Sequence, residues 1–266
     1  MSQQTNWVPT SVDLEKPSAA RIYDYVLGGN HNFAVDREFV KQMNKVDPSS
    51  RHFALQNRAF LRRAVLFLME QGVRQFLDLG SGIPTVGNVH EIAQAADPSA
   101  RVVYVELEHV AVAHSQLILE GNQNAVMVHA DITKPSLVLG DPATRAMIDF
   151  DRPLGILAVA IGHYILDDPE SVFAAYRDAA APGSYLALTH LTDDFRDMTE
   201  VTNGMRRTQN AVKARTRAEI ARLFGDWELA EPGLVMTSQW RPDRDADPRD
   251  VAEQRDGLYA GVARKG

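Results

Sequence analysis

The chain of 266 residues contains no cysteine. This absence excludes disulfides, thiolate zinc sites and a cysteine nucleophile, and it is compatible with a reducing compartment. We also expect no secretion signal, because residues 1–7 have neither a basic segment nor an apolar one. The best apolar run, residues 155–161, has the length of a strand and is far shorter than the roughly 18 residues of a membrane span. We therefore expect a cytoplasmic protein without a membrane partner.

Positive charge is in deficit. Lys and Arg total 28 against 35 Asp and Glu, which gives a formal net charge of -7. An acidic surface repels phosphate backbones, so we expect no nucleic-acid partner. The eight histidines are not grouped at metal-ligand spacing, and the acidic pairs 167–168 and 193–194 resemble helix caps or loops. No metal site is predicted, and nothing in the sequence indicates an oligomeric state.

The first 72 residues have a helical pattern. A short helix over 19–27 begins after Ser18, a possible N-cap, and ends at Gly28-Gly29. A second helix is expected over 36–46, and a third runs to residue 71 with Asp47 as its predicted N-cap. This pattern predicts an N-terminal helical extension over residues 1–72.

Strands and helices alternate after residue 73. Expected strands cover 75–79, 101–106, 125–130, 153–160 and 184–191, and expected helices cover 85–96, 109–121, 169–180 and 210–224. Two or three further strands fall within 227–230, 234–240 and 258–264, without an obvious helix between them. This order predicts an α/β fold over residues 73–266, with a Rossmann-like, mostly parallel sheet of seven strands and helices on both faces.

A glycine-containing loop follows the first strand and reads Asp78-Leu79-Gly80-Ser81-Gly82. Glycine allows a sharp turn and close approach of a ligand to the backbone, and the following helix would present its N–H groups there. The loop departs from the dinucleotide pattern, because Pro84 and Thr85 stand where that pattern continues toward its third glycine. Asp78 would suit the ammonium group of an amino acid such as methionine. A tight turn without any ligand is the alternative.

Acidic residues also follow the next two strands. Glu106 lies 24 positions after the second loop glycine, close to the spacing of about 20 at which a carboxylate binds ribose hydroxyls in nucleotide-binding units. Glu108 is a competitor for this role. Asp131 follows the third strand and is a candidate acceptor for an adenine amine, with Leu107 and Ile132 on the two faces of the ring. Solvated loop carboxylates or helix caps are the alternatives, but all three features together favour an adenosine cofactor.

Four segments carry a resemblance to a known family. They are residues 17–33 (PSAARIYDYVLGGNHNF), 78–90 (DLGSGIPTVGNVH), 181–185 (APGSY) and 259–265 (YAGVARK). The sequence resembles class I S-adenosylmethionine-dependent methyltransferases, and more narrowly a bacterial S-adenosyl methyltransferase family that was formerly a domain of unknown function. The resemblance implies S-adenosylmethionine as cofactor and a seven-stranded sheet with an N-terminal helical extension, but no particular substrate. The chain has VELEH at 105–109 where members tend to have an aspartate-rich stretch.

The N-terminal segment is a candidate lid. Arg21 and Tyr25 lie four positions apart, on one helical face. Tyr25 would add cation–π attraction to a sulfonium, Arg21 would meet a carboxylate, and Gly29 would allow close approach to the cofactor. A docked helix with a glycine C-cap is the alternative.

The fourth strand ends near the expected acceptor. Ala160 is expected on the cofactor side, whereas His163 is the candidate general base with Tyr164 beside it. His190, at the end of the fifth strand, is a weaker second candidate. The Asn/Asp-Pro-Pro-Tyr run typical of nucleobase amine methylation is absent here. The sequence thus predicts a methyltransferase acting on a small molecule. A non-catalytic protein that binds S-adenosylmethionine or its demethylated product is the alternative, and a nicotinamide-dependent oxidoreductase comes third.

Overall fold

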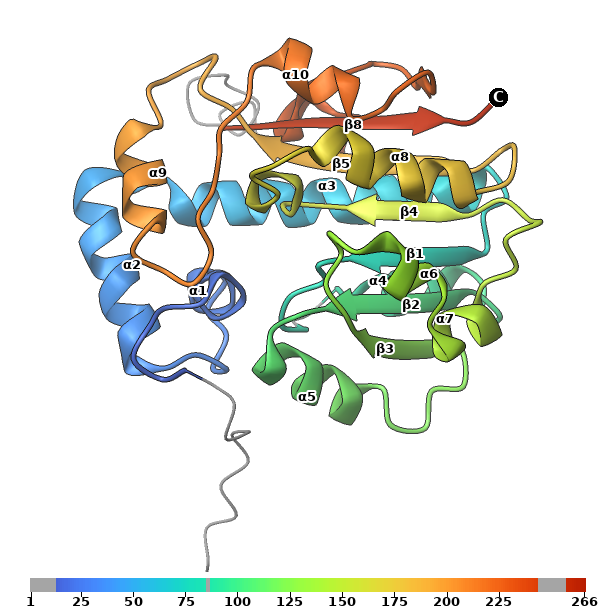
Figure 1. The fold of residues 1–266 in the computed structure, drawn as a ribbon, viewed down its shortest axis with the longest axis horizontal. Coiled ribbons are helices and arrows are strands. Elements are labelled where there is room, and N and C mark those ends of the chain that lie inside the picture. The colour runs from blue at the N-terminus through green and yellow to red at the C-terminus, as the bar shows by residue number, and fades with distance from the viewer. Residues whose placement is uncertain (1–12, 85–86, 244–256) are drawn as a thin grey trace, which may run out of the picture.

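The computed structural model describes residues 13–84, 87–243 and 257–266 (Figure 1). Short runs of apolar residues form its five parallel strands, β1 (Gln75–Leu79), β2 (Arg101–Glu106), β3 (Ala125–His129), β4 (Gly155–Ala158) and β5 (Tyr185–Leu191). Nearly every residue of these strands is buried, as expected when helices cover both faces of a parallel sheet.

In the described residues three more strands join the sheet by antiparallel pairing: β6 (Glu228–Leu229), β7 (Val235–Met236) and β8 (Leu258–Arg264). β8 pairs with β5 along one edge, and on its other edge it pairs with β6 near residue 264 and with β7 near residue 260. The order is β3-β2-β1-β4-β5-β8-β6, with β7 beside β8. The eight strands therefore fill seven positions, which confirms the predicted mostly parallel, Rossmann-like sheet.

Ten α-helices surround the sheet in the described residues. They are α1 (Ala19–Val26), α2 (Ala34–Val46), α3 (Ser50–Glu70), α4 (Val89–Ala96), α5 (His109–Ile118), α6 (Pro135–Leu139), α7 (Pro142–Met147), α8 (Pro169–Ala179), α9 (Thr199–Met205) and α10 (Arg217–Arg222). Two short 3₁₀ turns, η1 (Gly162–Tyr164) and η2 (Thr237–Gln239), follow β4 and β7. Side chains of α3, α4 and α5 pack on one face of the sheet, and those of α6, α7, α8 and α10 on the other.

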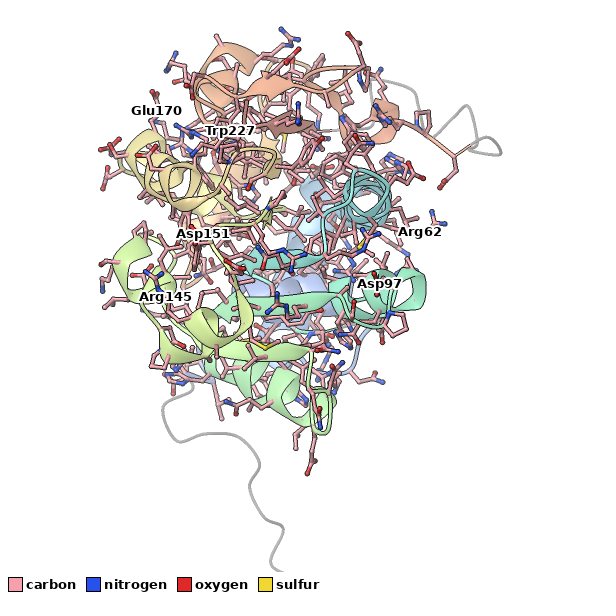
Figure 2. The ribbon with its side chains drawn as sticks, turned by 90° about the vertical axis from the view of Figure 1, so that its right-hand side faces the viewer. Arg62, Asp97, Arg145, Asp151, Glu170 and Trp227 are labelled. Carbon is pink, nitrogen blue, oxygen red and sulfur yellow. The ribbon has the colours of Figure 1, made fainter. Side chains whose placement is uncertain are left out.

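The helices α1, α2 and α9 take a different place. They lie together beyond the carboxyl ends of the parallel strands, at the left of Figure 1. The expected N-terminal extension thus divides, because α3 covers the sheet whereas α1 and α2 stand over the strand ends. Figure 2 looks onto the opposite edge, where Asp97 and Asp151 lie in loops that precede β2 and β4.

Strand order sets the position of a ligand site. The chain runs outward from β1 to β2 and β3, and then returns to place β4 on the other side of β1. In sheets of this kind a crevice opens beyond the carboxyl ends of the two strands where the order reverses. Here that place lies between β1 and β4, beneath α1.

Three local predictions need correction. The helix expected over 210–224 is confined to α10, because the backbone before it carries Arg215 into the core, where its guanidinium donates to carbonyls of Gly162 and Ile165 at 3.3 and 2.7 Å. The strand expected over 234–240 is only β7 followed by η2. Asp47 follows α2 instead of capping α3, and its carboxylate binds Arg196.

None of the helices in the described part of the chain combines the length and apolar content needed to cross a membrane. Within the same residues, no group of three or more histidine and carboxylate side chains is placed to hold a metal ion.

Candidate functional site

A cavity of about 360 Å³ lies at the strand ends beneath α1. It receives residues from the loops after β1, β2, β3 and β4 and from α1 and α3. Of the residues singled out from the sequence, the structure brings to its wall Arg21, Asp78, Gly80, Ser81, Gly82, Glu106, Leu107, Asp131, Ile132, Ala160 and Tyr164. Tyr25, Gly29 and His163 are not among the described residues that line it.

The loop after β1 turns through two left-handed glycines. Gly80 and Gly82 both have φ near +68°, and the N–H groups of Gly80 and Ser81 donate to the carbonyl of Val105 at 2.8 and 3.1 Å. A Cβ on Gly80 would lie 2.4 Å from the side chain of Ile161, whereas a Cβ on Gly82 would meet no atom within 4 Å. Gly80 is therefore required by packing, and Gly82 leaves room for a ligand.

The following helix does not face this space as the sequence suggested. It begins at Val89, and its first turn is capped by Asn88 together with Glu91. Thr85, the expected start, lies outside the described residues, and no residue of α4 lines the cavity. The groups that the loop presents are its own backbone and the hydroxyl of Ser81, whose Oγ is buried without a hydrogen-bond partner in the described structure.

Asp78 is buried at the end of β1 beside the loop. Burial raises the pKa of its carboxyl to about 7; the charge of Arg58 opposes this rise and that of Glu106 adds to it. Arg58 comes from α3, lines the same cavity and donates to the carbonyl of Gly87 at 2.7 Å. Sequence reasoning missed Arg58, because a single arginine in a long amphipathic helix carries no local signal.

The two glutamates after β2 have different surroundings. One carboxylate oxygen of Glu106 accepts from the N–H of Gly82 at 2.8 Å, and the other accepts from Leu107 and Glu108 at 2.8 and 2.9 Å. Burial raises its pKa, although these three N–H bonds favour the ionised form. In contrast, Glu108 caps α5 through the N–H of Ala111 and accepts from Arg21. Glu106 is therefore better placed than Glu108 to bind a ligand, because the Glu108 carboxylate is already held in an ion pair with Arg21.

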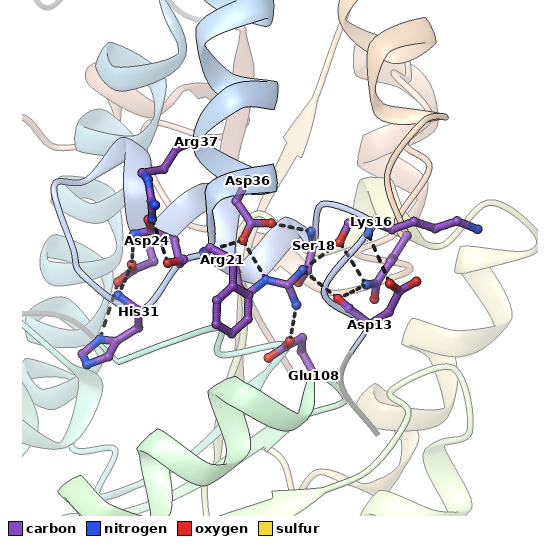
Figure 3. A network of polar contacts seen from close by, with 12 residues as sticks. Asp13, Lys16, Ser18, Arg21, Asp24, His31, Asp36, Arg37 and Glu108 are labelled. Carbon is purple, nitrogen blue, oxygen red and sulfur yellow. Dashed lines mark hydrogen bonds and ion pairs between the residues drawn. The ribbon is translucent and has the colours of Figure 1, made fainter. Parts of the chain in front are cut away.

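Figure 3 shows how Arg21 joins α1 to the rest of the protein. Its side chain is fully buried, and Nε donates to Asp36 at 2.8 Å while Nη1 donates to Glu108 at 2.9 Å. Nη2 donates to the carbonyl of Lys16 at 2.7 Å, and the guanidinium lies 5.0 Å from the ring centroid of Phe33. The carboxylates that Arg21 meets are therefore those of the protein.

Gly29 has a structural explanation as well. A Cβ there would lie 2.0 Å from a carboxylate oxygen of Asp24. The other oxygen of Asp24 accepts from the N–H of His31 and from the amide of Asn32, both at 2.8 Å. The glycine thus makes room for a carboxylate that orders the turn between α1 and α2.

Two apolar side chains flank the loops after β2 and β3. Ile132 is buried, whereas Leu107 is 56% exposed, and both line the cavity. Asp131 lies beside them, and one of its oxygens accepts from the N–H and hydroxyl of Thr133 at 2.9 and 2.7 Å. Asp131 therefore both forms this turn and lines the cavity.

A hydrogen-bonded relay supports the end of the cavity near β4. Ala160 has a left-handed backbone, with φ of 57°, and its N–H donates to Thr189 at 2.7 Å. The Thr189 hydroxyl donates to the amide oxygen of Asn57 at 2.7 Å, and the Asn57 amide donates to the hydroxyl of Tyr23 at 3.0 Å. Tyr23 in turn donates to the carbonyl of Ala54 at 3.1 Å. Strained backbone held by buried polar groups is typical of functional sites.

Tyr23, Asn57 and Tyr164 all line this end of the cavity. Burial raises the pKa of both tyrosines. Tyr23 lies inside the segment that carries the family resemblance, but only the relay shows that this residue, and not Tyr25, faces inward.

The two candidate histidines lie behind the cavity wall. His163 is buried and accepts from the N–H of Leu191 at 3.4 Å, and burial holds its pKa well below the ordinary value, with His190 and Arg215 adding to the effect. Nε2 of His190 accepts from Arg215 at 2.9 Å, while Nδ1 donates to the carbonyl of Leu191 at 2.7 Å. Burial lowers the pKa of His190 to about 4. Neither ring lines the cavity, so the structure does not support the expected general base.

Comparison with known proteins gives the family. The sequence profile described as S-adenosyl methyltransferase matches residues 5–266. The chain belongs to this family. A crystal structure from Thermobifida fusca, described as a candidate methyltransferase, is 43% identical, with a TM-score of 0.92 over 98% of this chain and 99% of that one. A DUF574 family protein from Streptomyces avermitilis is 34% identical, with a TM-score of 0.89 over 96% and 99% of the two chains. No curated protein sequence matches at a significant level.

The family resemblance expected from the sequence is thereby confirmed, and the protein is an S-adenosylmethionine-dependent methyltransferase. The cavity of this methyltransferase fits such a cofactor. It offers an unpartnered hydroxyl at Ser81, open space at Gly82, and carboxylates at Asp78 and Glu106 that can accept from ammonium and hydroxyl donors.

Proposed function

We propose that this methyltransferase binds S-adenosylmethionine along the cavity and transfers the methyl group to a small-molecule acceptor. In this arrangement Asp78 and Arg58 hold the amino-acid end, Glu106 holds the ribose, and the adenine lies between Leu107 and Ile132. The observation that carries the proposal is the convergence of the loops after three neighbouring strands on one cavity, at the place where strand order reverses.

The amino-acid end of the cofactor carries an ammonium and a carboxylate. Asp78 and Arg58 supply the two opposite charges beside the glycine loop. An ammonium next to Asp78 would offset the burial that raises the pKa of this carboxyl. The Ser81 hydroxyl supplies a further donor and acceptor at the same end.

The ribose and adenine are assigned to the next two strand ends. Each carboxylate oxygen has two lone pairs, so Glu106 retains acceptor capacity beyond its backbone bonds and can receive the ribose hydroxyls. The apolar pair Leu107 and Ile132 supplies the two faces of the adenine site. The second oxygen of Asp131 receives no bond from Thr133; it lies 3.6 Å from the ammonium of Lys134 and keeps lone pairs that can accept from the adenine amine.

The cover over the cavity supports a small acceptor. The amide oxygen of Asn210 accepts from the first N–H of α1 at 3.0 Å, and the N–H of Gln209 donates to the carbonyl of Pro17 at 3.0 Å. These bonds join the segment before α10 to the N-terminal layer, which we assign as a lid. The cavity volume of about 360 Å³ is near the lower end of pockets that enclose a drug-sized ligand, roughly 300–1,000 Å³. The cavity would therefore admit only the reacting end of a bulky acceptor. The acidic net charge disfavours a nucleic acid.

Catalysis in this site depends on positioning. The bound cofactor supplies a methyl group on a cationic sulfur. The chain orients the two reactants in line through the loop after β1 and the relay behind Ala160, and the lid keeps water out. Neither His163 nor His190 lines the cavity, and His109, which does, lies after β2 on the side assigned to the ribose and adenine, so no histidine base is assigned.

Two measurements test the proposal on the full chain. Calorimetric titration with S-adenosylhomocysteine should show one binding site. Glu106→Gln should lower the affinity for S-adenosylhomocysteine at least tenfold, and Glu108→Gln should lower it less than Glu106→Gln does. Labelled methyl transfer from S-adenosylmethionine into a cell extract should appear in the small-molecule fraction. Transfer only into protein or nucleic acid would contradict the small-molecule acceptor, and absence of cofactor binding would contradict the site.

A further inference from the structure

We infer that the methyl acceptor is an uncharged amine, which becomes cationic when it is methylated. The inference rests on the proposed cofactor site and concerns the chemistry that the remaining cavity accepts. Three observations support the inference: the cavity wall has more carboxylates than cations, both of its arginines already have structural or cofactor roles, and tyrosines lie at the end near β4.

Carboxylates outnumber cations on the cavity wall. The acidic residues are Asp13, Asp78, Glu106, Glu108 and Asp131, and the arginines are Arg21 and Arg58. Charges in a partly buried cavity interact more strongly than in water, because less solvent screens them. The bound cofactor would add one net positive charge, so carboxylates would still be in excess, and an anionic acceptor, such as a phenolate or a carboxylate, would enter against this field.

Both arginines have structural or cofactor roles. Arg21 donates to Asp36 and Glu108 and to backbone carbonyls near residue 16. Arg58 lies close enough to Asp78 to oppose the rise in its pKa, and it donates to the backbone of the loop after β1. With Arg58 assigned to the cofactor carboxylate, the wall offers no further arginine or lysine to an anionic acceptor among the described residues.

The end near β4 offers tyrosines and an amide. Tyr23 donates its hydroxyl proton to Ala54 and accepts from Asn57, so its remaining capacity is that of an acceptor, which suits an N–H donor. Tyr23 lies near enough to Tyr164 to contribute to the raised pKa of the Tyr164 hydroxyl. Aromatic faces attract a cationic nitrogen. Since burial raises the pKa of both phenols, neither serves as a base near neutral pH.

An amine satisfies these constraints without a base. The nitrogen lone pair forms the new C–N bond, and the S–C bond breaks with its electron pair going to sulfur. Positive charge moves from sulfur to nitrogen, so the charge inside the acidic cavity is unchanged by the transfer. The methylated ammonium then releases a proton to solvent. An alcohol would need a base to take its proton during attack, and the described residues at the end near β4 present none.

A pair of probes with similar shape tests this inference, one an uncharged amine and the other an anion. The full-length protein is first saturated with S-adenosylhomocysteine and then titrated calorimetrically at pH 7.5 with aniline, which is uncharged at this pH, or with benzoate. We expect aniline to bind at least tenfold more tightly than benzoate. Tyr23→Leu should reduce aniline affinity at least fivefold, whereas Phe195→Leu, which alters an aromatic ring outside the cavity wall, should leave it unchanged.

The comparison within the unmodified protein does not depend on any variant being folded. Equal or tighter binding of benzoate, or no binding of either probe to a protein that holds S-adenosylhomocysteine, would overturn the assignment of an amine. Failure of S-adenosylhomocysteine itself to bind would instead overturn the proposed cofactor site, so the two failures are distinguishable.

Discussion

Cofactor affinity should depend on pH through Asp78. Burial raises the pKa of this carboxyl to about 7 in the free protein, and the proposed ammonium partner requires the ionised form. For an acid whose pKa in the free protein is raised, binding that needs the anion is fully present above that pKa and is lost as pH falls below it. The affected window thus lies between about pH 5 and pH 7, where an aspartate with an ordinary pKa of about 3.9 would stay ionised.

The size of this effect follows from the ionised fraction. A site with a pKa of about 7 is mostly ionised at pH 8 and about one-tenth ionised at pH 6, so affinity should fall about tenfold over that interval and about 100-fold by pH 5, provided that the bound carboxyl titrates lower still. Isothermal titration with S-adenosylhomocysteine at constant ionic strength measures this dependence directly.

Asp78→Asn removes the titrating group. The variant should lose the tenfold step between pH 8 and pH 6, and at pH 8 it should bind about 10- to 100-fold more weakly, since a hydrogen bond to a charged group contributes about 1.5–3 kcal/mol. Asp97→Asn is the matched control, because Asp97 lies at the opposite edge of the sheet (Figure 2) and pairs with Arg74. If the unmodified protein bound equally well at pH 5.5 and pH 8, the assignment of Asp78 to an ammonium would be refuted.

Three further variants probe other parts of the site. Gly80→Ala should lower the free energy of unfolding by about 1–3 kcal/mol more than Gly82→Ala, measured by urea denaturation, because the two share a φ near +68° but only the first would place a Cβ 2.4 Å from another side chain; equal losses would contradict this. His163→Phe should change cofactor affinity by no more than about threefold relative to the unmodified protein, because the His163 ring does not line the cavity. A loss above tenfold would indicate that His163 belongs to the binding site after all. Arg21→Met should cost about 3–5 kcal/mol of stability in thermal or chemical unfolding, since it leaves the buried Asp36 without its ion-pair partner; an unchanged melting temperature would argue against that role.

Much of the fold was predictable because its signals are local. Short apolar runs separated by helical segments identify β1 to β5, and the order of these elements is enough to expect a parallel sheet. The predictions failed where distant contacts decide local structure. Ser18 was the expected cap of α1, but its side chain makes no capping bond, and the first N–H of the helix is bound by Asn210 from far along the chain. Arg215 likewise holds the segment before α10 out of a helix.

The cofactor half of the candidate site was predictable for a related reason. Asp78, Gly82 and Glu106 stand at the ends of strands, and the carboxyl ends of parallel strands meet at one edge of the sheet. The other half was not, because it is formed by the packing of α1 and α3 over that edge. Only this packing brings Tyr23 and Asn57 to the cavity, whereas His163 lies behind the cavity wall because its ring packs against His190.

A crystal structure of the full chain with S-adenosylhomocysteine tests the central claim most directly. The account predicts the ribose hydroxyls within hydrogen-bond distance of Glu106, the amino-acid end between Asp78 and Arg58, and the adenine beside Ile132. A ligand with its ribose on Glu108, or with its amino-acid end away from the loop at residues 78–82, would contradict it.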